Sequence, residues 1–273
     1  MRRSSIPTQA TLVVPKFTAE DLSLDNRYFY IAHTMKKSNM PVWGLPIFRT
    51  TYADDDLWIS YLQTLYDGTH NSLRNAKQQI LTPHFFCHVF EDASLDGASK
   101  ETIRERFAQW VTETAGERVK PDSKGVVYDE IPQDFACLIV DDYCIKIFAE
   151  IQNHQDQWIK ESAPIIVFFK DWDIDYYRGQ HRSEWTDGEI HKEVDEFDDP
   201  EELCIPDEKD LIFFEEVDGL RAPVLGWMYA KIGSMADLYN DLGEGRGTRE
   251  VWYRAYARPP RVFPDQDDDE WKL

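Results

Sequence analysis

The sequence predicts an α+β domain with helices packed on one face of an antiparallel sheet. Three observations support this prediction. A strand-helix-strand pattern begins near residue 42, a similar pattern returns near residue 224, and nearly continuous apolar runs at 135–141 and 163–169 lie between them. Two such units with intervening strands favour a ferredoxin-like arrangement, either single or duplicated.

The opening unit begins with a strand and continues into a helix. Aromatic and β-branched residues fill 42–52, and three consecutive aspartates at 54–56 then supply an N-cap and negative charge for the first helical turn. Trp58 and Leu62 belong to an apolar stripe at helical spacing, and Gly68 is expected just past the end of the helix. A second strand is expected to end near Glu91.

The middle of the chain predicts one more helix and two buried strands. The segment 92–103 resembles a calcium-binding loop, but Ile103 stands where a glutamate ligand is needed, so a turn that leads to a helix N-cap at Ser99 is favoured. The helix buries Phe107 and Trp110. The runs 135–141 and 163–169 predict central strands, and 142–152 predicts a short helix between them.

The second unit repeats the pattern of the first. A strand at 224–232 precedes a helix that is capped at Ser234 and ends at Gly243, and 249–257 predicts a further strand. The apolar stripe of this helix consists of Met235, Leu238, Tyr239 and Leu242. One core is expected to contain Trp58, Leu62, Phe107, Trp110, Val140, Val167 and Leu238.

Composition divides the chain into three parts. Residues 1–40 predict an N-terminal arm, 41–262 a single α+β domain, and 263–273 an acidic tail. A charged stretch at about 171–210 has few aliphatic residues and interrupts the domain as an acidic excursion.

Charge and cysteine usage narrow the class of protein. The net charge of -21 repels a phosphate backbone and disfavours nucleic acid as a partner. Nowhere do 18 apolar residues run together, so no membrane span is expected. The four cysteines, Cys87, Cys137, Cys144 and Cys204, are scattered, which is typical of reduced thiols. We therefore expect a soluble cytoplasmic protein.

Several blocks of the sequence carry a resemblance. They are FRTTY (48–52), EDASLDGAS (91–99), RERFAQWV (104–111), LIVDD (138–142), GWMYAKIGS (226–234) and YRAYARPP (253–260). As a set they resemble an uncharacterised protein family of filamentous fungi with no established activity. The resemblance spans about 41–262. It implies a fungal intracellular protein and carries over no catalytic residue.

The leading functional hypothesis is a non-catalytic protein-interaction protein. No stretch carries a specific catalytic or cofactor signature, whereas Arg246, Arg249, Arg254, Arg258 and Arg261 crowd one region of an otherwise acidic chain. Strand alternation places Trp252, Arg254, Tyr256 and Arg258 on one face, a composition typical of interaction hot spots. This arginine-aromatic face is predicted to bind a partner protein or the chain's own acidic segments.

The alternative is a metal-dependent hydrolase or transferase that uses aspartates at strand ends. Asp141 ends one predicted strand, and Asp171 and Asp173 follow the next, so their carboxylates could meet at one sheet edge and hold Mg²⁺. Such a site also needs a base or a phosphate-holding group, and the sequence assigns neither. No metal or cofactor is therefore predicted, and the oligomeric state stays open.

Overall fold

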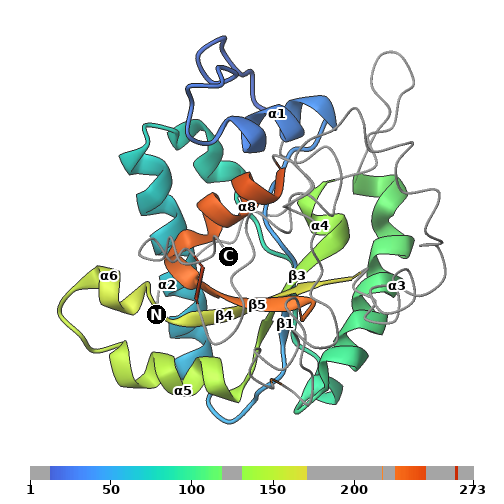
Figure 1. The fold of residues 1–273 in the computed structure, drawn as a ribbon, viewed down its shortest axis with the longest axis vertical. Helices are drawn as coiled ribbons and strands as arrows, with labels where there is room; N and C mark the ends of the chain where they lie inside the picture. The colour runs from blue at the N-terminus through green and yellow to red at the C-terminus, as the bar shows by residue number, and fades with distance from the viewer. Residues whose placement is uncertain (1–12, 119–130, 171–216, 218–224, 244–261, 264–273) are drawn as a thin grey trace, which may run out of the picture. The chain divides into compact units, whose positions relative to one another are not determined.

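The structure is a computed structural model that describes residues 13–118, 131–170, 217, 225–243 and 262–263 (Figure 1). Internal contacts divide the chain into two units, Met1–Lys170 with Met228–Leu273, and Asp171–Trp227. Almost all of the second unit lies outside the described residues, so the first is described here. The acidic excursion at 171–210, the strand at 249–257 and the tail beyond Phe263 also lie outside them.

Six strands form one mixed sheet in the order β2-β1-β3-β4-β5-β6. The strands are β1 (Ile47–Arg49), β2 (Val89–Phe90), β3 (Ala136–Val140), β4 (Pro164–Phe169), β5 (Trp227–Lys231) and β6 (Val262–Phe263). β1 pairs parallel with β2 and β3, β5 pairs parallel with β6, and β3 pairs antiparallel with β4. The α+β class is confirmed, but the prediction of an antiparallel, ferredoxin-like sheet is wrong in its strand pairing.

Helical crossovers explain the parallel pairs. Between β1 and β2 lie α2 (Asp55–Asn75) and the 3₁₀ helix η2 (Gln79–His84). Between β2 and β3 lie η3 (Ala93–Leu95), α3 (Lys100–Arg118) and α4 (Pro132–Phe135). A strand followed by a crossover helix returns in its original direction. The chain goes from β1 to its neighbour β2 on one side and then crosses back over β1 to β3 on the other side. Because both crossovers are right-handed but run in opposite directions, α2 and α3 lie on opposite faces of the sheet.

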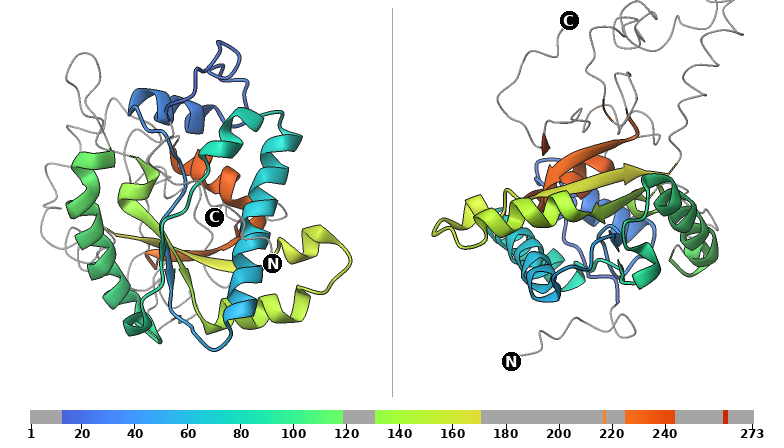
Figure 2. Two further views of the ribbon diagram at one scale, coloured as in Figure 1. Left: turned by 180° about the vertical axis from the view of Figure 1, so that it is seen from behind. Right: turned by 90° about the horizontal axis from the view of Figure 1, so that it is seen from below.

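Side-chain contacts of β1 confirm that both faces are covered. The Phe48 ring meets Phe107 of α3 with 6.3 Å between centroids, while the next residue, Arg49, lies over the Trp58 ring of α2 at 5.1 Å. Because successive strand residues point to opposite faces, α2 and α3 flank β1 on two sides, as Figure 2 shows. The prediction that helices pack on one face is therefore wrong.

The helix α2 begins as predicted and ends later than predicted. The Asp54 carboxylate accepts from the Leu57 amide at 2.8 Å, so the N-cap is confirmed. The helix then continues through Gly68 to Asn75. A Cβ at Gly68 would lie 2.9 Å from the Gly233 Cα, so this glycine allows close packing against the turn η6 (Ile232–Ser234) instead of ending the helix.

Other elements agree with the sequence patterns. The short helix α5 (Asp142–Ile151) follows β3 as predicted, and a second short helix, α6 (Gln157–Lys160), which the sequence analysis did not predict, precedes β4. The helix α8 (Met235–Gly243) buries all four predicted apolar residues and ends at Gly243. A helix that the sequence did not indicate, α1 (Phe29–Lys37), lies within the predicted arm, packs on α8 and buries Ile31 and Met35 completely.

Most of the predicted core is buried. Trp58, Phe107, Val140, Val167 and Leu238 are each at most 2% exposed, whereas Leu62 and Trp110 are only partly buried. Trp110 lies beside Phe90 of β2, the outermost strand of the described sheet. In the part of the chain that the structure describes, no helix is both long and apolar enough to cross a membrane.

Candidate functional site

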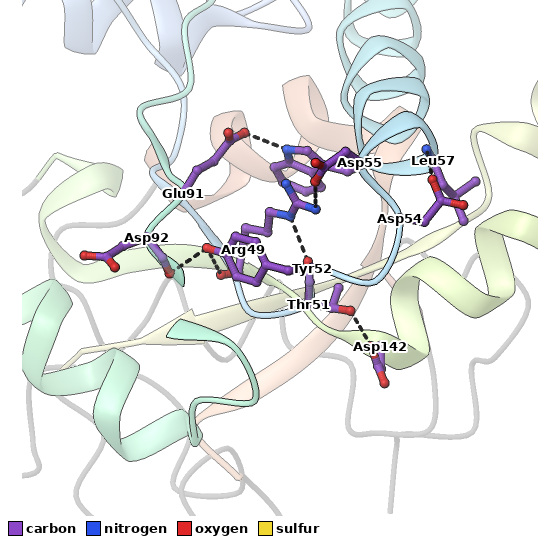
Figure 3. Close-up of polar contacts among 10 residues, drawn as sticks. Arg49, Thr51, Tyr52, Asp54, Asp55, Leu57, Glu91, Asp92 and Asp142 are labelled. Atoms are coloured by element: carbon purple, nitrogen blue, oxygen red, sulfur yellow. Dashed lines mark hydrogen bonds and ion pairs between the residues drawn. The ribbon is translucent and has the colours of Figure 1, made fainter. Parts of the chain in front are cut away.

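The strand order creates a switch point between β1 and β3, because the chain leaves β1 to one side and returns on the other. In open sheets with parallel strands, ligands bind beyond the carboxyl ends of the strands at such a point. Here those ends are 50–52 after β1, 91–92 after β2 and 141–142 after β3. We call these residues, with the first turn of α2, the carboxyl edge (Figure 3).

Two helix N-termini at the carboxyl edge are already capped. Asp54 caps α2, and the Asp141 carboxylate accepts from the Cys144 amide of α5 at 3.0 Å. The Thr51 hydroxyl donates to the Asp142 carboxylate, which ties the end of β1 to the start of α5. Amides at helix N-termini bind phosphate in many enzymes of related architecture, but carboxylates of the chain itself take that place here.

A buried cation, Arg49, lies at the centre of the carboxyl edge. Its Nε donates to the Thr51 carbonyl at 2.7 Å, and its Nη2 donates to Asp55 Oδ1 at 2.6 Å. The guanidinium carbon lies 4.3 Å from the Tyr52 ring centre and 5.1 Å from that of Trp58. Two aromatic rings and one carboxylate therefore surround a charge that is almost wholly removed from water.

We call Arg49 with Tyr52, Asp55 and Trp58 the arginine cluster. The loop after β2 is hydrogen-bonded to this cluster. The Tyr52 hydroxyl donates to the Asp92 carbonyl at 2.7 Å, and the Trp58 indole Nε1 donates to Glu91 Oε1 at 2.6 Å. The Ser94 amide donates to the Asp92 carboxylate at 2.9 Å, and this bond lowers the pKa of Asp92. Burial raises the pKa of Tyr52. These contacts hold the loop in place. At neutral pH Asp92 is ionised and Tyr52 is protonated.

Nucleophilic and metal-ion chemistry have little support among the described residues. Cys87, Cys137 and Cys144 are buried, and burial raises the pKa of Cys87 to about 12, so the reactive thiolate is scarce. Within the described ranges no group of three or more His, Cys, Asp or Glu side chains could hold a metal ion.

The aspartate alternative depended on two strand ends that meet at one sheet edge. Because β3 and β4 are antiparallel, the end of β4 lies beside the start of β3: the Lys170 amide donates to the Phe135 carbonyl at 2.9 Å. Asp141 follows the other end of β3. Asp171 and Asp173 lie outside the described residues, but the geometric premise that brought them to Asp141 does not hold.

The predicted partner-binding residues, Trp252, Arg254, Tyr256 and Arg258, lie outside the described residues, so that prediction stays a prediction. Sequence reasoning missed the arginine cluster. One signal could have indicated it: Arg49 is a charged residue inside the apolar strand IFR, directly before the polar residues TTY.

Fold and site together define a class: a mixed α+β sheet domain whose switch point carries a buried arginine and strand-end carboxylates in internal contacts. No protein-family model matches the chain, and no curated protein or solved structure matches it.

Proposed function

We propose that this chain is a non-catalytic protein-interaction protein. The observation that supports the proposal is that the carboxylates beside the switch point accept hydrogen bonds from the chain itself. Asp54 and Asp141 cap helices, Asp142 accepts from Thr51, and Glu91 accepts from Trp58. An enzyme of this architecture would need a base or nucleophile there with a lone pair directed at substrate.

The proposed contact surface is the arginine-aromatic face of Trp252, Arg254, Tyr256 and Arg258. Its support is charge segregation: five arginines lie within 246–261 of a chain whose net charge is -21. Arginine and aromatic side chains dominate interface energetics, and arginine pairs well with carboxylates. The proposed partner is a protein with an acidic surface. The chain's own acidic segments are the competing occupant.

We further propose that the protein works in the cytoplasm and belongs with the fungal family whose motifs it resembles. Three unpaired cysteines in the described core support a reducing compartment. The family relation rests on the sequence blocks alone.

A thermal-shift series tests the non-catalytic proposal. Full-length protein is melted with Mg²⁺, Mn²⁺ and a panel of nucleotides, and we expect no change in Tm. A ligand at one hundred times its Kd stabilises the folded state by about 2.7 kcal/mol, so specific binding would be visible. A rise in Tm with a metal and nucleotide together would favour the hydrolase or transferase alternative.

A second experiment tests the contact surface. A hexaglutamate peptide is titrated at low salt into the wild type and into the double variant Arg254→Glu, Arg258→Glu, which we expect to lose binding. The matched control is Arg74→Glu with Lys77→Glu, which makes the same charge change at exposed positions at the end of α2. Equal weakening in both double variants would mean that net charge, and not this face, governs binding.

A further inference from the structure

Hydrogen bonding of the buried Arg49 is incomplete. Nε and Nη2 have acceptors, whereas Nη1 donates to no acceptor among the described residues. Nη1 is not among the fully buried side-chain atoms that lack a partner, so water or a ligand can reach it. A guanidinium is a cation with five donors, and a free N–H of this kind can take a further acceptor. We propose that Arg49 anchors a binding site for a small zwitterion, and that Asp55 holds the place of the ligand's carboxylate in the unliganded protein.

Asp55 is suited to be displaced. The Arg49 side chain is 5% exposed, but the Asp55 side chain that pairs with it is 77% exposed. Rotation of Asp55 into water therefore costs that residue little, because it is already largely hydrated. An incoming carboxylate has the same shape and charge, so it needs no new cavity. A bidentate carboxylate would also give Nη1 an acceptor.

The surrounding charges select the rest of the ligand. Glu91, Asp92 and Asp142 are exposed at the same edge and repel a simple anion. Glu91 and the Arg49 guanidinium both contact the Trp58 ring system, so a carboxylate site and an ammonium site lie on one aromatic platform. Figure 3 shows Arg49 directed at Asp55. A molecule with a carboxylate and an amine, such as a basic amino acid, matches this pattern.

Three small molecules test carboxylate binding and ammonium binding separately. L-lysine carries both groups, L-lysinamide lacks the carboxylate, and acetate lacks the amine. The readout is the Trp58 indole N–H resonance, since its acceptor Glu91 takes the ammonium in the proposed complex. We expect L-lysine to shift this resonance, with a Kd about tenfold lower than either of the other probes.

The variant Asp55→Asn tests the role of the internal carboxylate. It removes the competitor of the ligand, so L-lysine should bind about tenfold more tightly than to the wild type. Asp56→Asn is the matched control, because Asp56 is exposed in the same helical turn and the helix loses the same charge. Arg49 itself is not substituted, because it is the proposed binding group and packs against Tyr52 and Trp58. Asp55→Asn leaves the buried Arg49 without its carboxylate partner, so the Tm of this variant is compared with that of Asp56→Asn before the titration.

Each contrary result overturns a stated part of the proposal. Equal binding of L-lysine and L-lysinamide would mean that Arg49 takes no carboxylate. Equal affinity of Asp55→Asn and Asp56→Asn for L-lysine would mean that Asp55 does not compete with the ligand for Arg49. No shift of the Trp58 resonance in any variant would refute the site as a whole. The outcome is independent of the proposed arginine-aromatic face, whose residues the experiment leaves unchanged.

Discussion

Several short polar side chains in the described structure accept hydrogen bonds from backbone amides close to them in the sequence. Asp54 and Asp141 accept amides three residues ahead, and Asp92 accepts the amide two residues ahead. Ser99 accepts from the Thr102 amide at 3.2 Å and begins α3 as the sequence predicted. Such local bonds explain why short polar residues stand where strands give way to helices.

The N-cap of α2 gives a prediction at this scale. Asp54→Ala should lower the free energy of unfolding by about 1 kcal/mol, because the Leu57 amide loses its acceptor. Chemical denaturation measures the change. Asp56→Ala, in the same segment, removes a charge without removing a cap and should cost less; equal losses would show that the cap bond contributes nothing.

A pH dependence is expected from His70. Burial is the main cause that lowers its pKa, Asp67 opposes the shift and Arg74 adds to it. The unfolded chain, with a histidine pKa near 6.5, then binds the proton more readily than the folded chain. The contribution of His70 to stability is therefore full above about pH 6.5 and is lost as pH falls toward the lower folded pKa.

The variant His70→Phe isolates this effect. It keeps a ring against Tyr66 and Phe85 and removes the titrating group. Denaturation between about pH 5 and pH 7 should show a shallower loss of stability on acidification than in the wild type. Identical slopes for the two proteins would contradict the lowered pKa.

At the scale of elements, α2 organises the described structure. It has 21 residues and contacts η2, α5, α8 and η6. Its first turn belongs to the carboxyl edge, and its middle packs closely on the turn before α8. Stability at the switch point and packing near α8 are therefore coupled through one helix.

The close packing at Gly68 predicts an unusual sign. Gly→Ala inside a helix normally stabilises by up to about 1 kcal/mol. At Gly68 the added Cβ would lie 2.9 Å from the Gly233 Cα and 3.2 Å from the Glu161 side chain, and a backbone atom cannot turn away. Gly68→Ala should therefore destabilise by about 1–3 kcal/mol in chemical denaturation. Gln63→Ala, exposed on the same helix, should be neutral or stabilising.

At the scale of the whole molecule, aromatic residues link the sheet to both helical layers. On one face Phe48 stacks on Phe90 at 4.4 Å and meets Phe107 of α3. On the other, the Tyr61 ring of α2 meets Phe148 of α5 at 5.2 Å, and the Tyr61 hydroxyl donates to the Pro164 carbonyl of β4 at 2.6 Å. The two layers enclose strands β3 and β4, whose residues are all buried. Loss of one central ring should therefore affect the entire fold.

Two truncations in α3 compare the core with its margin. Phe107 is fully buried, and Phe107→Ala should cost about 3–5 kcal/mol, a large part of a domain's stability. The sequence placed Trp110 in the same core, but Trp110 is only partly buried, so Trp110→Ala should cost less. Thermal and chemical denaturation of both variants measure the order. A greater loss at Trp110 would contradict the burial described for α3.

The sequence by itself determined most of the local structure. It predicted an N-cap among the aspartates at 54–56, the cap at Ser99, the buried strands β3 and β4, the helix α5 and the end of α8 at Gly243. These features depend on hydrogen bonds and apolar spacing within a few residues. Interactions of this kind can be predicted from the types and spacing of neighbouring residues.

Tertiary structure alone decided the strand order, the two-sided helical cover, the passage of α2 through Gly68 and the cluster around Arg49. Each depends on residues far apart in the chain: β1 joins β3 across about ninety positions, and Gly68 meets Gly233. An apolar run shows that a strand is buried but not which strand lies beside it or in which direction it runs. A glycine shows that no side chain is tolerated but not whether a turn or a neighbouring backbone is the cause.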